Sequence, residues 1–270
     1  METLFELKDV YFSYLKKFPA LCGVSMTVQK GEKISLMGAN GTGKSTLLAL
    51  FDGLIFPDKG SIRAFGKELT EGLLGDDLFS QFFRRQVGFV FQNPEVQLFC
   101  PTVKEDIVFG PLQLGVSTQE VKKRLERLAE SLGVSHLLER APHQLSIGEK
   151  RKVTIASVLA IEPEVIILDE PTAGLDPMTT RHIIDILVDA HKDGKTIITA
   201  THDLHVAEEI SDTLYVLGHE RKITRAGPPC EIVKDEAFLL KNNLIHIHRH
   251  QHKETSHIHP HYHLHPEHHG

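Results

Sequence analysis

The sequence predicts an α/β fold built around a mostly parallel sheet, and three observations lead to this prediction. Short apolar runs typical of buried strands alternate with helix-forming segments through most of the 270 residues. One of these runs, residues 34–37, leads directly into a glycine-rich loop and then into a helix-forming stretch. Another, residues 165–168, ends in the two carboxylates Asp169 and Glu170. Because ligands bind beyond the carboxyl ends of parallel strands, these two strand ends mark the expected site.

The glycine-rich loop matches the pattern G-x-x-x-x-G-K-[ST], in which a backbone free of Cβ atoms wraps a triphosphate. Its N–H groups and the dipole of the following helix face the anion. Lys44 is expected to reach the β- and γ-phosphates, and the Ser45 hydroxyl is expected to ligate Mg²⁺. The alternative, a flexible glycine-rich turn, fits the strand–loop–helix context poorly. The expected nucleotide-binding residues are Gly38, Ala39, Asn40, Gly41, Thr42, Gly43, Lys44, Ser45 and Thr46.

Composition is that of an ordinary soluble protein of one or two domains. The chain is 41% hydrophobic and 24% charged, and no run approaches the roughly 18 apolar residues of a membrane span. The first residues lack the layout of a signal peptide. Cys22, Cys100 and Cys230 show no C-x-x-C spacing, so reduced thiols in the cytosol are expected. A net charge of −6 argues against a general nucleic-acid binder.

The remaining elements follow from periodicity and from turn and capping signals. Ser117 and Glu120 form a capping box that opens a helix, and Asp176 begins another at the following proline. Residues 70–77 are expected to be an exposed loop, and Pro228 and Pro229 to end the regular structure. Strands are expected at 4–7, 10–14, 24–28, 61–67, 86–92, 164–170, 196–200 and 213–217, and helices at 117–132, 148–160 and 176–191.

The two carboxylates after residues 165–168 suit the chemistry of triphosphate cleavage. Asp169 suits the Mg²⁺ coordination shell, and Glu170 suits the polarisation of an attacking water. The alternative is a pair of solvated loop acids, which the presence of the Lys44 loop disfavours.

With these two motifs placed, residues 4–244 resemble an ATP-binding-cassette (ABC) ATPase. Residues 145–149 are similar to the signature motif, and residues 173–176, which include Asp176, are similar to the D-loop. Gln92 matches the Q-loop glutamine, His202 the switch histidine, and Tyr14 the aromatic residue that stacks on adenine. A lone Gln or His is more often structural, but these elements occur in the family order.

The resemblance implies a P-loop NTPase (RecA-like) core with an antiparallel β subdomain and an inserted helical subdomain at about 94–160. The ATPase domain would span residues 1–245. It further implies that two chains pair head to tail, with each ATP and its Mg²⁺ between the Lys44 loop of one chain and Ser146 and Gly148 of the other. In the implied mechanism Gln92 and Glu170 orient the water, and His202 contacts the γ-phosphate. Ser45, Gln92 and Asp169 would hold Mg²⁺.

The signature motif departs from the usual Leu-Ser-Gly-Gly-Gln. Ile147 stands in place of a glycine and Glu149 in place of the glutamine, whereas Ser146 and Gly148 are kept. A Cβ at 147 could crowd the phosphate, and a carboxylate at 149 adds like charge near it. A tolerated variant with slower turnover is therefore expected.

Residues 90–99 and 102–115 resemble the energy-coupling-factor (ECF) importers more specifically. In that family the ATPase drives the uptake of vitamins or of cobalt and nickel ions. The resemblance implies a transmembrane coupling protein and a substrate-binding membrane protein as partners. It places this chain at the cytoplasmic face of the cell membrane as a peripheral subunit. It also implies that the loop after Gln92 and the helices beyond it form the groove for the helices of the coupling protein.

The tail, residues 246–270, is rich in histidine and is expected to lack regular structure. Neutral imidazoles two residues apart bind Ni²⁺ and Co²⁺, which favours cobalt or nickel over a vitamin. A purification tag or a solvating tail is the alternative. A soluble ABC protein outside transport and a metal-delivery GTPase also stay open, although the chain has neither a second cassette nor an N-K-x-D motif. The candidate metal ligands are His246, His248, His250, His252, His257, His259, His261, His263 and His265.

Overall fold

The protein, described here by a computed structural model, has a central six-stranded sheet that is parallel except at one edge. The structure describes residues 2–252 and 255–261, and from His246 onward it describes the backbone alone. The strand order β10-β9-β3-β8-β7-β6 has only β9 and β10 antiparallel, which confirms the predicted sheet. The strands are β3 (Lys33–Met37), β6 (Val87–Val90), β7 (Val165–Asp169), β8 (Thr196–Ala200), β9 (Thr213–Leu217) and β10 (Ile223–Gly227).

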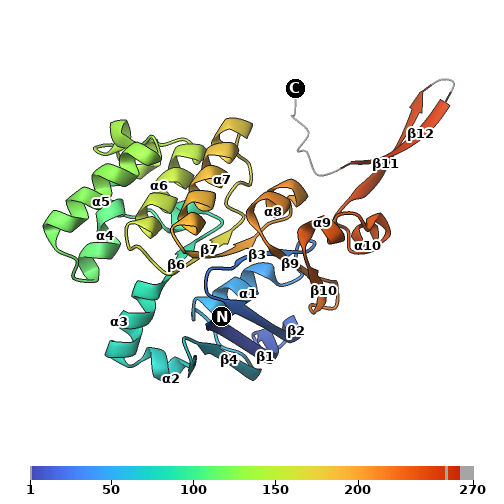
Figure 1. Cartoon of the computed structure of the whole chain (residues 1–270), viewed down its shortest axis with the longest axis horizontal. Coiled ribbons are helices and arrows are strands. Elements are labelled where there is room, and N and C mark those ends of the chain that lie inside the picture. The colour runs from blue at the N-terminus through green and yellow to red at the C-terminus, as the bar shows by residue number, and fades with distance from the viewer. Residues whose placement is uncertain (1, 253–254, 262–270) are drawn as a thin grey trace.

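A second, antiparallel sheet of four strands lies beside the first (Figure 1). Its order is β2-β1-β4-β5, with β1 (Thr3–Tyr14), β2 (Phe18–Gln29), β4 (Lys59–Ala64) and β5 (Lys67–Glu68). The two strands predicted at 4–7 and 10–14 are one strand, interrupted by a shift of register between Leu7 and Val10. Pro19 lies within β2, which tolerates it because an edge strand can leave one ladder position without an N–H donor.

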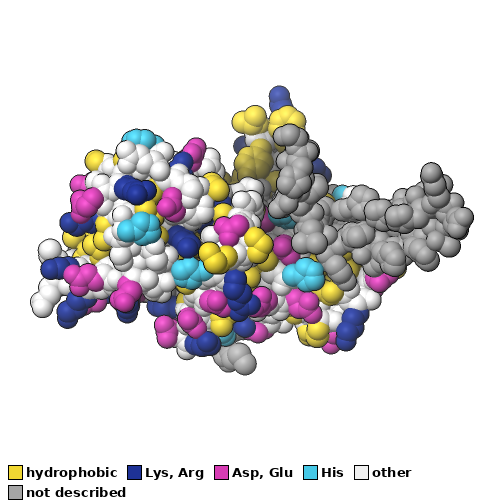
Figure 2. Space-filling model, turned by 90° about the horizontal axis from the view of Figure 1, so that it is seen from above, with side chains coloured by type: hydrophobic (Ala, Val, Ile, Leu, Met, Phe, Trp, Pro, Cys, Tyr) yellow, Lys and Arg dark blue, Asp and Glu magenta, His cyan; other side chains and the backbone are white. Residues whose placement is uncertain are grey.

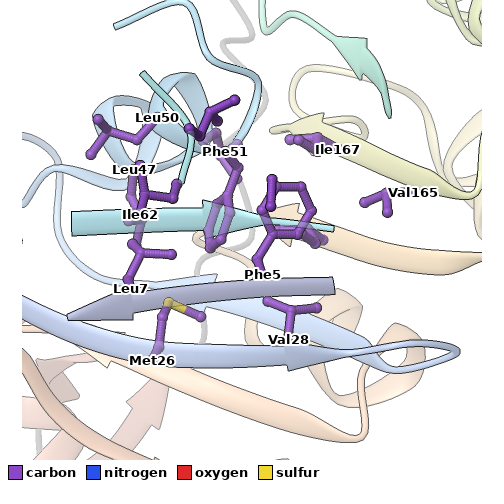
Figure 3. Close-up of a cluster of buried hydrophobic side chains, with 14 of the residues drawn as sticks. Phe5, Leu7, Met26, Val28, Leu47, Leu50, Phe51, Ile62, Val165 and Ile167 are labelled. Atoms are coloured by element: carbon purple, nitrogen blue, oxygen red, sulfur yellow. The ribbon is translucent and has the colours of Figure 1, made fainter. Parts of the chain in front are cut away.

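The helix after the phosphate loop, α1 (Lys44–Phe51), packs into the core between the two sheets. Figure 3 shows Leu47 and Phe51 of α1 close to Phe5 and Leu7 of the antiparallel sheet, with Val165 and Ile167 of β7 nearby. The rings of Phe5 and Phe51 meet edge to face, with centroids 5.1 Å apart. Side chains from both sheets therefore fix the position of the phosphate loop.

Three helices pack around a second hydrophobic core, which they share with the central sheet and with the helices that follow β7 and β8, and they confirm the predicted helical subdomain. They are α4 (Val103–Gln113), α5 (Thr118–Ser131) and α6 (Ile147–Leu159). Ser117 caps α5 by accepting from the N–H of Glu120, although the described contacts hold no return bond from the Glu120 side chain. Thr102 and Glu105 form a complete capping box at the start of α4. In Figure 1 these helices lie together, away from the antiparallel sheet. Helices α7 (Pro177–Lys192) and α8 (Leu204–Ile210) follow β7 and β8.

Two predictions about local structure are wrong. The segment expected to be an exposed loop at 70–77 contains α2 (Glu71–Leu74) and the start of α3 (Asp77–Gln86). Its polar residues are helix caps, because Thr70 accepts a hydrogen bond from the N–H of Leu73 and Asp76 accepts one from that of Phe79. Regular structure also continues past Pro228, in α9 (Pro229–Ile232) and α10 (Glu236–Lys241).

The backbone of the histidine-rich tail forms two antiparallel strands, β11 (His246–His252) and β12 (Thr255–His261), whereas the sequence predicted no regular structure there. Its histidine side chains lie outside the described residues. Within the described ranges, none of the helices has the length and apolar character needed to cross a membrane. On the face shown in Figure 2, Lys and Arg side chains are interspersed with Asp and Glu, so charge of one sign does not gather there.

Candidate nucleotide site

The phosphate loop joins β3 to α1, and its geometry requires glycine at the start of the helix. Gly43 caps α1 with φ 103°, and a Cβ at this position would collide with the carbonyl oxygen of Ala20. The Thr42 hydroxyl donates to the carbonyl of Ala39 at 2.8 Å and holds the loop closed on itself. The loop therefore keeps its main-chain N–H groups at the N-terminus of α1, where an anion is bound most favourably.

Lys44 lies folded across this loop. Its Nζ donates to the carbonyl of Gly38 at 2.7 Å and to that of Ala39 at 3.4 Å. Burial lowers the pKa of Lys44, and the charges of Glu170 and Asp169 act in the opposite direction. The ammonium is therefore held where it faces both the loop and the two carboxylates.

A cavity of about 450 Å³ opens beside the loop. It brings together predicted residues that are far apart in the sequence: Tyr14, Lys44, Gln92 and the carboxylate pair. The hydroxyls of Tyr14 and Thr46 are 3.2 Å apart, and the Tyr14 ring packs edge to face against Phe12 with 48% of the residue exposed. The ring is thus fixed at one edge and open on the side where a base can stack. The lining residues are Tyr14, Phe18, Pro19, Ala20, Asn40, Gly41, Gly43, Lys44, Ser45, Thr46, Gln92, Asp169, Glu170 and Arg221.

Asp169 provides the test of whether the site fits Mg²⁺. It is buried at the end of β7, and its Oδ1 has no hydrogen-bond partner within the described residues. Burial raises the pKa of Asp169, and a hydrogen bond from the Ser45 hydroxyl opposes this shift. An orphaned carboxylate oxygen beside a hydroxyl and the amide of Gln92 is a set of oxygen ligands that Mg²⁺ prefers, so the residues fit the ion.

Glu170 and His202 form a pair next to this carboxylate. The Nδ1 of His202 lies 2.8 Å from the Oε2 of Glu170, and this hydrogen bond raises the pKa of His202. Glu170 is buried and has a positive φ of 48°, and its N–H donates to the carbonyl of Ala200 at the end of β8. A non-glycine residue in this strained conformation is typical of functional sites. The strand end and the histidine together orient the carboxylate toward the cavity.

Six predicted nucleotide-binding residues do not line this cavity: Gly38, Ala39 and Thr42 belong to the phosphate loop itself, and Ser146, Gly148 and Asp176 lie on other elements. Ser146 caps α6: its Oγ accepts from the N–H of Glu149 at 3.3 Å, and the Glu149 carboxylate accepts from the N–H of Ser146 at 2.7 Å. This capping box lowers the pKa of Glu149 and engages its charge within the helix terminus. Asp176 caps α7 through the N–H of Thr179, and Gly148 faces the Thr179 side chain. His202 also does not line the cavity itself.

Two arginines that the sequence analysis missed lie at or near the site. Arg221, in the turn between β9 and β10, lines the cavity with a positive φ of 59°. Arg151 is buried on α6 and donates to the Q-loop backbone. Neither has a motif of its own, and Arg151 stands in a Lys-Arg-Lys run that resembles a solvated surface.

We expect Tyr14→Ala to weaken nucleotide affinity about tenfold or more, because stacking on a base contributes roughly 1–3 kcal/mol. Hydrolysis at saturating ATP should remain, since the phosphate-facing residues are untouched. A titration with a fluorescent ATP analogue checks this, with Tyr11→Ala on the same strand as the matched control. Unchanged affinity in the Tyr14 variant would move the stacking role to Tyr11 or Phe12.

These features define the class of the protein. A strand, a glycine loop and a helix that can cradle phosphates, with a carboxylate pair at the end of β7, make a P-loop nucleoside triphosphatase. The profile of the ABC transporter family matches residues 21–173, and the chain belongs to this family.

Individual relatives agree over nearly the whole chain. The nickel import ATP-binding protein NikO of Rhodobacter capsulatus is 47% identical over 248 residues, which are 91% of this chain and 97% of that protein. The energy-coupling factor transporter ATP-binding protein EcfA of Methanocaldococcus jannaschii is 44% identical over 88% of this chain and 84% of its own length. The solved structure of cbiO1 from Clostridium perfringens, part of the ABC transporter complex cbiONQ, has a TM-score of 0.76 and 35% identity, covering 90% of this chain and 96% of that one.

The chain is therefore the ATP-binding subunit of an ABC importer of the energy-coupling-factor type, and it is an ATPase whose hydrolysis is coupled to transport. ABC ATPases of this kind dimerise and pair with membrane components.

Proposed function

We propose that this chain hydrolyses ATP to drive the uptake of a transition-metal ion, cobalt or nickel. The observation that carries the hydrolysis is the single cavity in which Lys44, Asp169 and Glu170 converge. The choice of a metal rests on the nickel-import relative, 47% identical over 97% of its length, and on the spaced histidines of the tail. Uptake of a vitamin by the same kind of machine is the second candidate, since an EcfA protein is also a relative.

Phosphoryl transfer depends on positioning and charge neutralisation, and different residues at the nucleotide cavity would supply each. Ser45, Gln92 and Asp169 would hold Mg²⁺, which supplies charge neutralisation at the β- and γ-phosphates. Lys44 turns its ammonium from the loop carbonyls toward the phosphates. Glu170 polarises the attacking water, and His202 orients Glu170 through the 2.8 Å hydrogen bond and contacts the γ-phosphate.

A second copy of the chain would complete each site. Ser146 and Gly148 begin α6 outside the cavity, and the N-terminus of a helix favours an anion. In a head-to-tail dimer this terminus would face the γ-phosphate bound by the partner, and Asp176 would lie at the same contact. Ile147 is half exposed there, available to such a contact. Since this chain carries both the phosphate loop and the Ser146 terminus, two copies of it would be enough to form two complete sites, and no paralogous chain is needed.

The membrane partners would dock at a second hollow of about 330 Å³, between β6 and the helical subdomain. Phe99 and Phe109 line it and pack edge to face, and Phe99 is 66% exposed. An apolar groove of this kind accepts an amphipathic helix of the transmembrane coupling protein. The chain would then lie at the cytoplasmic face of the cell membrane as a peripheral subunit, beside a substrate-binding membrane protein. The net charge of −6 favours no nucleic-acid partner.

Uptake of radioactive nickel or cobalt tests the proposal. Cells that lack their own importer for these ions would express this chain together with the membrane proteins encoded beside it. We expect ion accumulation with the unaltered chain and none with Glu170→Gln, the matched control for hydrolysis. Accumulation of a vitamin but of neither ion would overturn the metal assignment and favour the second candidate.

The tail adds a separate measurement on the purified protein. A chain ending at Leu244 should bind less Ni²⁺ and Co²⁺ than the full chain, because closely spaced imidazoles are suitable ligands for both ions. ATP hydrolysis should be unchanged by the truncation, since the cavity residues named above all lie between Tyr14 and Arg221. Equal metal binding by the two chains would remove the tail from metal handling.

A further inference from the structure

Arg151 is a buried cation that the hydrolysis mechanism above does not use. It lies on α6 with 2% of the residue exposed, although arginine is seldom so buried unless it is paired. Its guanidinium donates through Nη1 to the carbonyl of Phe91 at 2.7 Å and through Nη2 to the carbonyl of Gln92 at 2.6 Å. A buried charge is thus directed at two consecutive main-chain oxygens of the Q-loop.

The other side of this Q-loop segment is held as well. The N–H of Phe91 donates to the Oε1 of Gln97 at 3.0 Å, and the Nε2 of Gln97 donates to the carbonyl of Phe89. The Gln97 side chain thus bonds to groups up to Phe91 N–H, whereas Arg151 donates to the carbonyl oxygens that follow β6, those of Phe91 and Gln92. With its main chain fixed in this way, the exposed side chain of Gln92 is kept at the wall of the nucleotide cavity.

The charge of Arg151 also lies close to the two carboxylates of the site. Burial lowers the pKa of Arg151, whereas the charges of Asp169 and Glu170 raise it. The guanidinium is oriented by the Q-loop carbonyls, and its Nε is buried without a partner within the described part of the chain. The carboxylates thus gain a nearby positive charge while remaining available to other ligands.

The neighbouring residue makes a second connection between the same two segments. Lys150 forms a 2.6 Å ion pair with Glu95, three residues beyond Gln92. Both cations come from the helix whose N-cap is Ser146. The terminus that would face the partner's nucleotide is thereby tied to the loop that faces the chain's own nucleotide.

We propose that Arg151 is the positioning residue of the Q-loop: it fixes the main chain of Phe91 and Gln92, so that the Gln92 amide meets the Mg²⁺ site, and it couples that loop to the Ser146 end of α6. This inference rests on the proposed role of Gln92. The planar fork of arginine can reach both carbonyls at once, whereas a lysine can offer only a point charge.

The test compares Arg151→Met with Arg124→Met. Arg124 is a matched control because its side chain is also largely buried and also donates to two consecutive carbonyls, those of Ala160 and Ile161, and none of these three residues lines the nucleotide cavity. We expect Arg151→Met to lower kcat about tenfold or more and to raise the Mg²⁺ concentration for half-maximal hydrolysis severalfold, with nucleotide affinity within about threefold of the original. Arg124→Met should change the melting temperature only.

Two further variants keep the outcome decisive. Arg151→Lys preserves the charge and should restore folding if the Met variant does not fold, while still raising the Mg²⁺ requirement. Gln92→Ala should raise this requirement at least as much. If Gln92→Ala raises it and neither Arg151 variant does, the positioning role is wrong while the Q-loop assignment holds. If Gln92→Ala leaves it unchanged, the proposed role of Gln92 fails, and the inference about Arg151 fails with it.

Discussion

Replacement of Glu170 by glutamine is expected to lower ATP turnover by about 10²–10⁴-fold, the usual contribution of a positioned base. The amide keeps the shape of the side chain but cannot take up a proton from the attacking water. ATP binding should survive because Lys44 and the phosphate loop are unchanged. Phosphate release at saturating ATP and Mg²⁺ measures the first effect, and a nucleotide titration measures the second.

The control for this variant is Glu164→Gln. Glu164 directly precedes β7, at the opposite end of the strand from Glu170, and forms an ion pair with Lys30 at the surface. It should retain normal turnover. ATPase activity close to normal in the Glu170 variant would mean that another group activates the water, and the assignment of the base would be wrong.

The same substitution should change the titration of His202. In the unaltered protein the hydrogen bond to Glu170 raises the pKa of His202. The pair therefore stabilises the folded state fully below the pKa of histidine in the unfolded chain, and this stabilisation is lost as the pH rises through the pKa of the folded protein. With glutamine at 170 the carboxylate partner is gone, and the pKa of His202 should fall. Nuclear magnetic resonance of the imidazole over a pH series reports this shift independently of turnover.

Two inactive variants should restore activity when they are mixed, if each nucleotide is shared between two chains. Lys44→Ala disables the phosphate loop, and Ser146→Arg blocks the start of α6. Each alone should lose about 10²-fold or more of turnover, because each removes groups that face developing charge. A mixed dimer has one site with an intact Lys44 from one chain and an intact Ser146 from the other. An equal mixture should therefore recover about a quarter of normal activity if the two sites act independently.

The control is a mixture of Lys44→Ala with Glu170→Gln, both of which damage the same side of the cavity. In a mixed dimer of these two, one site lacks Lys44 and the other lacks Glu170, so no site is complete. Recovery in this control as well, or equal turnover per molecule in dilute monomer and in concentrated protein, would contradict the shared pocket.

The parts of the site that the sequence predicts are those whose chemistry is local. Lys44 and Ser45 stand in one contiguous loop, and Asp169 and Glu170 end one apolar run, so the spacing alone places them. The family resemblance implies a stacking role for Tyr14; the structure places this residue in the cavity wall, with its hydroxyl 3.2 Å from that of Thr46.

What the sequence could not predict depends on tertiary contacts. Arg151 sits in a basic run typical of a solvated helix face, and only the packing of α6 against the Q-loop turns it inward. Residues 70–77 look like a loop because caps and turns use the same polar residues. The buried phenylalanines that stabilise α3, Phe79 and Phe83, come after the segment whose composition suggested a loop.

The burial of α1 between the two sheets limits which part of the molecule can move during ATP hydrolysis. Leu47, Leu50 and Phe51 are in contact with a core shared by both sheets, so any displacement of this helix would require the two sheets to separate. We therefore expect the phosphate loop to stay fixed relative to the two sheets. Any movement driven by triphosphate cleavage is instead expected in α4, α5 and α6, which contribute no side chain to that core and lie beside the proposed groove for a membrane partner.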